Sequence, residues 1–348
     1  MAETKRIAVV GFGNIGSGVV KALYEKSVAG LELVKVIDID LDKKRPVKIP
    51  KKMLSPHWQT VVNDPKIDII VELIGGIEPA KTILMRAMEK GKDVVTANKM
   101  LLAQDGQSIF AMASDTGRKV GFRASFVGCH SLIHEFQQAG NTAKKFRRIY
   151  AILNGTSNYI LSTMTRDDKT FREALKEAQE SGFAESNPSD DIDGIDTANK
   201  IRILLNLITN SFHKVLEFQI EGIRNVTPQD IQYAGELGYA IKLVGVIEQI
   251  GDSFAVGVHP ALMPQTSLLG SLQGAYNGTE LEDEYGVISG LVAPGAGVYP
   301  TTDAVIKDLV DIAEGRPVPM PASAEPLVLG GTEMAERRYY LRAICCSS

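Results

Sequence analysis

Cysteine is scarce in this sequence. Only Cys129, Cys345 and Cys346 occur among its 348 residues. Small extracellular domains that depend on disulfide bonds carry far more cysteine, and chains as poor in cysteine as this one are typical of reducing compartments. We therefore expect a cytoplasmic protein that is stabilised by apolar cores rather than by a disulfide framework.

The sequence also lacks long apolar runs and an excess of charge of one sign. No apolar segment approaches the ~20 residues that are needed to span a bilayer, and residues 1–6 do not lead into the apolar stretch of an export signal. The net charge is −4, and the longest basic block is Lys43-Lys44-Arg45. A nucleic-acid partner requires a concentrated cationic face. We therefore expect neither a membrane nor a nucleic-acid partner, but a small-molecule substrate.

The chain does contain enough apolar residues for two cores. Hydrophobic residues make up 44% and charged residues 23%, the balance of an ordinary globular protein, and the length suggests about two domains. Up to residue 125, nearly continuous apolar runs predict buried strands at 6–10, 33–37, 68–74, 93–97 and 119–122. Helical spacing at 80–90 and 108–116 separates the later runs. This α/β alternation predicts a parallel, Rossmann-type sheet in a dinucleotide-binding domain over residues 1–125.

The pattern changes from about residue 126, where long helical stretches are mixed with strand-like runs. We expect helices at 157–181 and 195–209 and strands at 148–153, 216–223 and 254–258. These elements predict an α+β second domain over residues 126–298. A further helix at 302–314 follows a turn rich in glycine and proline. We expect residues 299–330 to return to the first domain and residues 331–348 to form a C-terminal tail.

A glycine-rich turn follows the first predicted strand and opens a helix. Its members are Gly11, Phe12, Gly13, Asn14, Ile15 and Gly16. Gly11 permits the tight turn, Gly13 lets the backbone approach a pyrophosphate, and Gly16 lets helix and strand pack closely. Asp38 ends the second strand 22 residues after Gly16, where an acid accepts hydrogen bonds from the adenosine ribose. The pattern therefore predicts a nicotinamide dinucleotide site, although a glycine turn alone also occurs in unrelated α/β proteins.

The choice between NAD and NADP depends on two opposing features. The carboxylate of Asp38 should repel the 2′-phosphate of NADP, which favours NAD. Lys43, Lys44 and Arg45 follow closely and would attract that phosphate. We expect NAD to be favoured slightly, with NADP as the alternative.

From Val95-Thr-Ala-Asn-Lys99 onward, the chain resembles the homoserine dehydrogenases, and the resemblance covers most of its length. Val71-Glu-Leu-Ile-Gly-Gly76 is similar to the family's strand end beside the nicotinamide, and Asn154-Gly-Thr-Ser-Asn-Tyr159 to the start of its catalytic domain. The further matching motifs, in the family's order, are Gly182-Phe-Ala-Glu185, Asp190-Asp-Ile-Asp-Gly-Ile-Asp196, Lys200, Gly295-Ala-Gly297 and Pro300-Thr-Thr302.

The resemblance implies NAD(P)-dependent interconversion of L-homoserine and L-aspartate 4-semialdehyde, in threonine and methionine biosynthesis, by a homodimer. It implies that the second domain serves catalysis and dimerisation. Lys200 would be the acid/base residue, and Lys99 would lie where nicotinamide and substrate meet. Glu185, Asp191 and Asp196 would bind the substrate. The further residues that it places at the cofactor are Ile74, Gly75, Lys99, Gly182, Glu185 and Gly297.

The residue types around Lys200 agree with this chemistry, and a simpler interpretation also stands. Asp196 and Lys200 are four residues apart and would share one helix face, as in many exposed ion pairs. Glu185, Asp190, Asp191, Asp193 and Asp196 form an acidic cluster just before an apolar helix. Such a cluster suits a substrate that carries an ammonium group. It would also match the dipole of the helix N-terminus.

The resemblance is weakest at residues 123–134. The family has glutamate where this chain has Arg123, and a glycine-rich turn into isoleucine and proline where it has Cys129-His130-Ser131. In the family, backbone carbonyls of this stretch hold a monovalent cation. We expect the altered segment, including the arginine, to weaken cation binding and to reduce activity. Restoring glutamate at 123 and alanine-isoleucine-proline at 129–131 would then raise activity and its dependence on sodium or potassium. Histidines at 130 and 134, near Cys129, lack a fourth ligand, and we expect no metal site there.

Two alternatives to a homoserine dehydrogenase stay open. One is an oxidoreductase on the same scaffold that acts on another amino-acid semialdehyde, which the altered 123–134 segment would suit. The other is a nucleotide-binding protein without catalysis, which would not require Lys99, Glu185, Asp196 and Lys200 together. Longer relatives continue beyond a Tyr-Tyr-Leu-Arg segment into a regulatory ACT domain, whereas this sequence ends at Ser348. We therefore expect a short form without allosteric inhibition by threonine.

Overall fold

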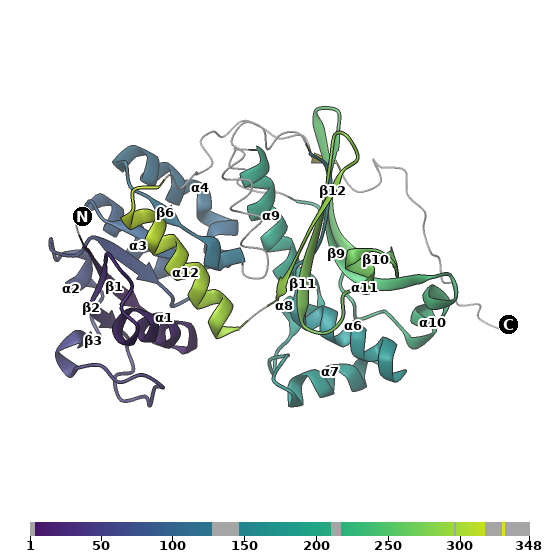
Figure 1. The fold of residues 1–348 in the computed structure, drawn as a ribbon, viewed down its shortest axis with the longest axis horizontal. Coiled ribbons are helices and arrows are strands. Elements are labelled where there is room, and N and C mark those ends of the chain that lie inside the picture. The colour runs from purple at the N-terminus through teal and green to yellow at the C-terminus, as the bar shows by residue number, and fades with distance from the viewer. Residues whose placement is uncertain (1–3, 127–145, 210–216, 296, 317–328, 331–348) are drawn as a thin grey trace.

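The computed structural model describes residues 4–126, 146–209, 217–295, 297–316 and 329–330 of the chain. They form two lobes that lie side by side, the first built by the N-terminal part of the chain and the second by its middle part (Figure 1). One late helix returns to the first lobe. No helix in these ranges is both long enough and apolar enough to cross a bilayer.

The first lobe contains a six-stranded sheet whose assigned pairings are parallel. Its strands are β1 (Lys5–Val10), β2 (Leu31–Ile37), β3 (Leu54–Ser55), β4 (Ile69–Glu72), β5 (Asp93–Thr96) and β6 (Val120–Gly121). Their spatial order is β3-β2-β1-β4-β5-β6, the order of dinucleotide-binding domains. The predicted parallel sheet is confirmed, and β3 is an edge strand that the sequence did not predict. Ligands of such sheets lie beyond the carboxyl ends of the strands where the order reverses, here β1 and β4.

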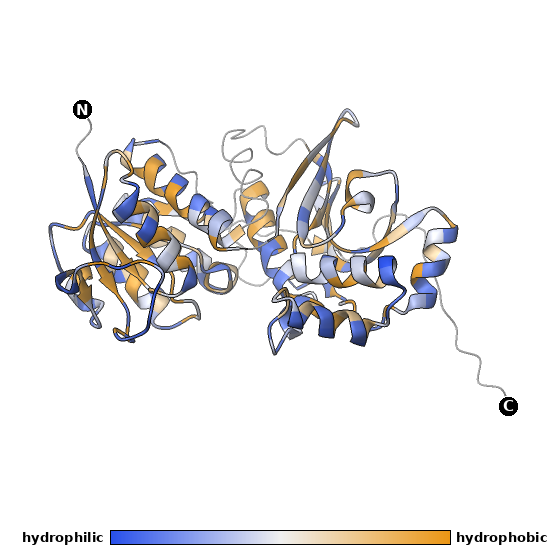
Figure 2. Cartoon of the chain, turned by 60° about the horizontal axis from the view of Figure 1, so that its bottom comes forward, coloured by the Kyte–Doolittle hydropathy of each residue, from blue (hydrophilic) through white to orange (hydrophobic). Residues whose placement is uncertain are grey.

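Helices surround this sheet. They are α1 (Asn14–Glu25), α2 (Gln59–Val62), α3 (Ala80–Glu89) and α4 (Lys99–Thr116), with 3-10 turns η1 (Lys51–Met53) and η2 (Arg123–Phe126). The returning helix, α12 (Val298–Ala313), contacts α1, β5 and β6 and adds Val305 and Leu309 to the core on one side of the sheet. Hydrophobic residues concentrate on the strands, and the helices carry both hydrophobic and hydrophilic residues (Figure 2). Sheet and helices together thus enclose the core that supports the strand ends.

The helix predicted at 108–116 begins nine residues earlier than the sequence suggested. Asn98 is its N-cap, and the side-chain oxygen of Asn98 accepts a hydrogen bond from the backbone N–H of Leu101 at 3.1 Å. An asparagine cap of this kind satisfies one of the free donors of the first turn. Lys99 is consequently the first residue of α4, at the end of the helix nearest β5.

The second lobe contains a larger sheet, mostly antiparallel. Its strands in the described residues are β7 (Phe146–Ile152), β8 (Gln219–Ile220), β9 (Tyr239–Ile250), β10 (Ser253–Pro264), β11 (Tyr276–Asp283), β12 (Ile288–Pro294) and β13 (Leu329–Gly330). They lie in the order β12-β11-β7-β9-β10-β13, with β8 beside β10. The strand predicted at 216–223 is limited to β8 in the described residues, and β9, β11 and β12 were not predicted.

The helices of the second lobe are α6 (Gly155–Asp167), α7 (Phe171–Glu180), α8 (Ser189–Ile192), α9 (Ile195–Thr209), α10 (Pro228–Glu236) and α11 (Leu268–Ser271). The predicted helix at 195–209 is confirmed as α9. The apolar face of α9 packs against β9 so closely that a Cβ on Gly245 would lie 2.5 Å from the side chain of Ile201. Asp196 and Lys200 are therefore carried on a helix that the core holds firmly.

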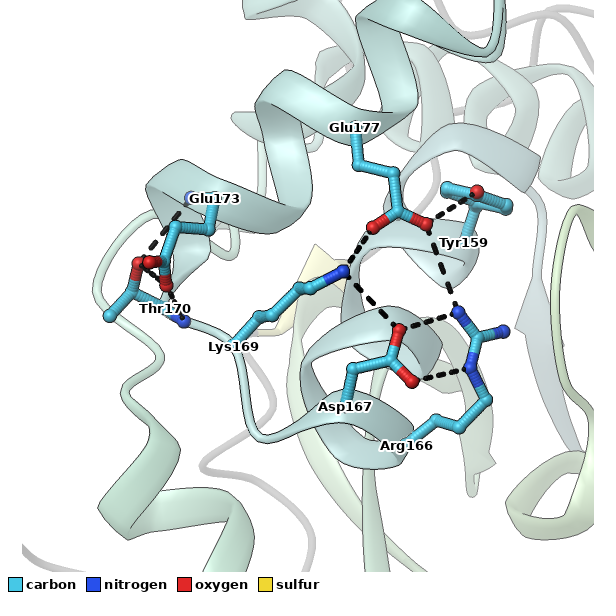
Figure 3. Close-up of polar contacts among 7 residues, drawn as sticks. All are labelled: Tyr159, Arg166, Asp167, Lys169, Thr170, Glu173 and Glu177. Atoms are coloured by element: carbon cyan, nitrogen blue, oxygen red, sulfur yellow. Dashed lines mark hydrogen bonds and ion pairs between the residues drawn. The ribbon is translucent and has the colours of Figure 1, made fainter.

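The single helix predicted at 157–181 is wrong, because the chain turns between α6 and α7. Asp168 ends α6 with a φ of 48°, and Thr170 starts α7 with a capping box to Glu173. Figure 3 shows how the turn is held: the ammonium of Lys169 lies between the carboxylates of Asp167 and Glu177, at 3.5 and 2.5 Å. The two helices thus form a hairpin beside the 182–185 segment.

Candidate active site

The glycine turn after β1 has the shape that a pyrophosphate requires. Gly11 has a φ of +105°, and a Cβ there would lie 2.7 Å from the backbone carbonyl of Leu73. A Cβ on Gly16 would lie 1.9 Å from the oxygen of Gly11, whereas one on Gly13 would meet nothing within 4 Å. Gly13 is also the N-cap of α1, and no side-chain hydrogen bond caps this helix in the described residues. The turn is therefore crowded at Gly11 and Gly16 and open at Gly13, where the pyrophosphate of a dinucleotide would approach the backbone.

Asp38 lies beside this turn, but its carboxylate already has protein partners. It accepts hydrogen bonds from the backbone N–H groups of Phe12 at 2.7 Å and Asp40 at 2.9 Å. The guanidinium of Arg45 lies 3.1 Å from it and 4.6 Å above the ring of Phe12. Arg45 also donates to the carbonyl oxygens of Phe12 and Lys43, and only 6% of its side chain is exposed. Arg45 therefore uses its guanidinium to hold residues 38–45 against the glycine turn.

The centre of the site is a chain of ion pairs that joins the two lobes. Asp196 Oδ1 pairs with the ammonium of Lys99 from α4, and Asp196 Oδ2 lies 2.9 Å from the ammonium of Lys200, one turn further along α9. The Lys200 ammonium also donates to the carbonyl oxygen of Leu153. Lys200 and Asp196 are buried, while 43% of the Lys99 side chain is exposed. Two cations from different lobes thus share one buried carboxylate.

Asn154, directly after β7, connects this carboxylate to a second one. Its side-chain nitrogen donates to Asp191 at 2.6 Å and to Asp196 at 3.0 Å, and its oxygen accepts from the backbone N–H of Ser157 as the N-cap of α6. The sequence motif contained Asn154, but sequence reasoning gave it no role. Its place just before a helix, as an asparagine, was the available signal. The structure brings Asn154, Asp191 and Asp196 together from three helices, as the N-cap of α6, within the short α8 and in the first turn of α9.

The two carboxylates differ in their electrostatic environment. Burial opposes the negative charge of Asp196, but the charges and hydrogen bonds of Lys200 and Lys99 outweigh it and hold its pKa below the usual range. For Asp191, burial dominates and raises the pKa, although the hydrogen bond from Asn154 opposes it. Burial also acts against the charge of Lys99, but Asp196 more than compensates and raises the pKa of Lys99. Asp196 is therefore the permanently ionised member of the cluster.

Several residues predicted for the site make no hydrogen bond or ion pair with this cluster in the described part of the chain. The side chain of Glu185 is exposed and makes no ion pair in the described part of the chain, and Asp193 instead pairs with Arg224. Gly182 and Gly297 have φ values of +76° and +136°, and Gly297 precedes α12. The 182–185 segment is anchored by Phe183, whose ring stacks on Tyr159 with centroids 4.3 Å apart.

Ile74 and Gly75 follow β4, at the strand end beside Gly11. Their backbone N–H groups donate to Glu72 at 2.8 and 3.2 Å, and 40% of the Ile74 side chain is exposed. The loop therefore turns its backbone inward and presents Ile74 outward. Ile74 and Gly75 were predicted at the cofactor, whereas no role was predicted for the buried Glu72 that holds them.

Arg123 has a different environment from the one that its sequence position suggested. Its guanidinium lies 3.1 Å from Asp308 and 2.5 Å from Asp311, both on α12, and its backbone N–H donates to Asp308 at 2.8 Å. All three side chains are buried. Arg123 is thus paired with two acidic residues of α12, and its effect on a monovalent cation stays a prediction. Cys129, His130 and His134 lie outside the described residues.

Comparisons with known proteins agree on one family. The family profile described as homoserine dehydrogenase matches residues 132–310, and the profile described as the NAD-binding domain of homoserine dehydrogenase matches residues 11–123. A homoserine dehydrogenase from Synechocystis is 37% identical over 322 residues, which cover 89% of this chain and 73% of that protein. The Bacillus subtilis homoserine dehydrogenase is 34% identical over 88% of this chain and 72% of its own length. The crystal structure of a homoserine dehydrogenase from Thiobacillus denitrificans superposes with a TM-score of 0.84 at 34% identity, covering 95% of this chain and 81% of that one.

Proposed function

The chain belongs to the homoserine dehydrogenase family, and we propose that its Lys99–Asp196–Lys200 cluster is where L-homoserine and L-aspartate 4-semialdehyde are interconverted. The observation that carries this proposal is the buried carboxylate of Asp196, shared by one lysine from each lobe. The enzyme is an oxidoreductase with a nicotinamide dinucleotide-binding domain. The cluster lies beyond the carboxyl end of β5, on the side of the sheet where such a ligand binds.

The reduction of an aldehyde adds a hydride to the carbonyl carbon and a proton to its oxygen. A bound dinucleotide would supply the hydride, and we assign the proton to the ammonium of Lys200. Lys200 suits this role because it is buried and held by Asp196 Oδ2 and the carbonyl oxygen of Leu153. In the opposite direction, the neutral Lys200 amine would accept the proton of the substrate hydroxyl. Asp196 stays ionised and holds the lysine in place throughout.

The remaining polar groups suit the other end of the substrate. Asp191, which Asn154 positions, and Asp190 are acidic groups at the start of the helical segment, and an amino acid carries an ammonium group that they would bind. Glu185 would have to approach from the exposed 182–185 segment to take part. We propose Asp191 as the principal anchor and Glu185 as a residue that engages when substrate is present.

A spectrophotometric assay at 340 nm with L-homoserine and each oxidised dinucleotide tests this function. We expect turnover with L-homoserine. Turnover of L-serine should be much slower, because its hydroxyl is one methylene closer to the amino group. Equal or better turnover of another amino-acid alcohol would favour the alternative substrate class. Binding of dinucleotide with no turnover of any such alcohol would favour a non-catalytic protein.

We expect NAD(H) to be used at least as well as NADP(H). Asp38 places a carboxylate beside the dinucleotide turn. Arg45 is held by Asp38 and by three backbone carbonyls, which leaves it poorly placed to bind a 2′-phosphate. Steady-state kcat/KM for both cofactors measures the preference. A strong NADP preference that disappears in the double variant Lys43→Ala, Lys44→Ala would show that these exposed lysines decide instead.

The homodimer and the cytoplasmic location stay predictions. Exposed apolar side chains on and beside β11 and β12, including Tyr276, Ile288 and Val292, support a further protein contact at that edge of the second sheet. Light scattering that gives the mass of one chain would contradict the dimer.

A further inference from the structure

A buried carboxylate that the proposed chemistry does not use lies beneath the loop after β4. Glu72 is the last residue of β4, and none of it is exposed. Its Oε1 accepts hydrogen bonds from the backbone N–H groups of Ile74 at 2.8 Å and Gly75 at 3.2 Å, and its Oε2 accepts one from the hydroxyl of Thr96 at 2.6 Å. A carboxyl group in a dry interior is costly unless such donors surround it. Glu72 is therefore a buried carboxyl group whose position depends on these three donors.

The same network reaches the first residue of α4. Glu72 and Thr96 are direct neighbours across β4 and β5. The Thr96 hydroxyl also accepts a hydrogen bond from the backbone N–H of Asn98 at 3.0 Å. Asn98 in turn donates through its side chain to the carbonyl oxygen of Gly76 at 2.5 Å and caps α4. Lys99, which follows Asn98, is thus placed by residues that Glu72 holds.

The loop at 73–76 needs such support. Gly75 and Gly76 both have a φ of +71°, a conformation that glycine adopts readily but does not hold by itself. The loop also forms a wall of the dinucleotide turn, because the backbone of Leu73 approaches Gly11 too closely for a Cβ. A shift of the loop would therefore change the space beside the dinucleotide turn and the position of Lys99 together.

We infer that Glu72 is a positioning residue that orders the 73–76 loop and the start of α4 for the nicotinamide half of the dinucleotide. This inference rests on the proposed function for the location of the nicotinamide. Glu72 touches neither substrate nor cofactor and acts through Ile74, Gly75 and Thr96. We expect the adenosine half at Asp38, which has no hydrogen bond to this network in the described part of the chain.

The variant Glu72→Gln separates the two halves. The glutamine amide keeps the size of the side chain, but its NH₂ group must face either the loop N–H groups, which are also donors, or the Thr96 hydroxyl, which then has no acceptor for its own proton. We expect the Kd of NADH, measured by calorimetry, to rise by about tenfold or more. The Kd of ADP-ribose, which contains the pyrophosphate but lacks the nicotinamide, should rise much less, and kcat should fall as well because Lys99 moves.

Three further variants control the experiment. Thr96→Ser keeps the hydroxyl and should behave like the wild type, whereas Thr96→Val removes it and should reproduce the selective loss of NADH affinity. Glu89→Gln makes the same substitution at an exposed position of α3 and should change nothing. If thermal unfolding shows that Glu72→Gln does not fold, the difference in NADH affinity between Thr96→Ser and Thr96→Val tests the same network.

Unchanged NADH affinity, or an equal loss for NADH and ADP-ribose, would overturn the role of Glu72. Both affinities are measured without substrate, so the result does not depend on homoserine turnover. If Glu72→Gln weakens NADH more than ADP-ribose but the wild type does not oxidise L-homoserine, the proposed function is contradicted and the positioning role of Glu72 stands.

Discussion

Replacement of Lys200 by methionine should lower kcat by about 100-fold or more, because general acid/base groups contribute about 10²–10⁴-fold. Methionine fills much of the same buried space but has no proton to transfer. The dinucleotide site is built on another lobe, at the turn after β1, and the Kd of NADH should be unaffected. Steady-state kinetics with L-homoserine and calorimetry with NADH measure the two effects separately.

The chain offers a matched control at Lys92, another buried lysine. Its ammonium donates to the backbone carbonyl oxygens of Asp64 and Ile67, away from the ion-pair chain of the site. Lys92→Met should reduce stability but leave the kcat of the folded enzyme near that of the wild type. Near-wild-type turnover in Lys200→Met would remove Lys200 from the mechanism. A similar loss of kcat in both variants would show that the loss of any buried lysine lowers kcat, and that the effect does not report proton transfer.

The sequence predicted those parts of the site that are encoded over short distances. The turn at Gly11–Gly16 follows from the steric needs of three glycines between a strand and a helix. Likewise, Asp196 and Lys200 pair because four residues make about one turn of α9. In contrast, Asn154 lies 42 residues from Asp196, and Lys99 lies 97 residues from it. No periodicity relates such positions, and only the family motifs placed Lys99 near the substrate.

The sheet of the second lobe was predicted poorly for reasons that its strands make clear. β10 continues through Pro260 to Pro264, and proline usually argues against a strand interior, so only 254–258 were predicted. β9 is apolar on both faces along much of its length, a pattern that does not separate a strand from a buried helix. Helices α6 and α7 were joined because a continuous helical pattern conceals a single residue with positive φ. Pairing with distant strands thus determines β9 and β10, and the φ of one residue, Asp168, separates α6 from α7.

Arg123→Glu should destabilise the protein by about 3–5 kcal/mol, the usual cost of breaking a buried ion pair from one side. The guanidinium of Arg123 is buried between Asp308 and Asp311, and a glutamate there would gather three carboxyl groups at the contact between η2 and α12. A loss of this size lowers Tm by about 4–7 °C in a protein of this length. Lys307→Glu, a charge reversal at an exposed ion pair of the same helix, should have almost no effect.

The pH dependence of this loss follows from Asp308. Burial, only partly offset by Arg123, raises the pKa of Asp308 to about 7 from an ordinary value of 3.8. A carboxyl group whose pKa is higher in the folded chain stabilises it at low pH, and this contribution is lost as the pH rises through the folded pKa. Without Arg123 the pKa of Asp308 in the folded chain moves above 7, so that the variant continues to lose stability as the pH rises above 7. The Tm difference between variant and wild type should therefore be larger at pH 8 than at pH 6.

The same variant decides between two interpretations of Arg123. If the arginine chiefly repels a monovalent cation, glutamate at 123 should raise activity and make it depend on sodium or potassium. If it chiefly ties α12 to the first lobe, the variant should lose stability, and added cations should not restore it, because the missing charge lies between two buried carboxylates of α12. Differential scanning fluorimetry and the 340 nm assay, each with and without 0.1 M KCl, separate these results. The buried contacts with Asp308 and Asp311 lead us to expect the loss of stability, and unchanged Tm with cation-stimulated turnover would show that this expectation is wrong.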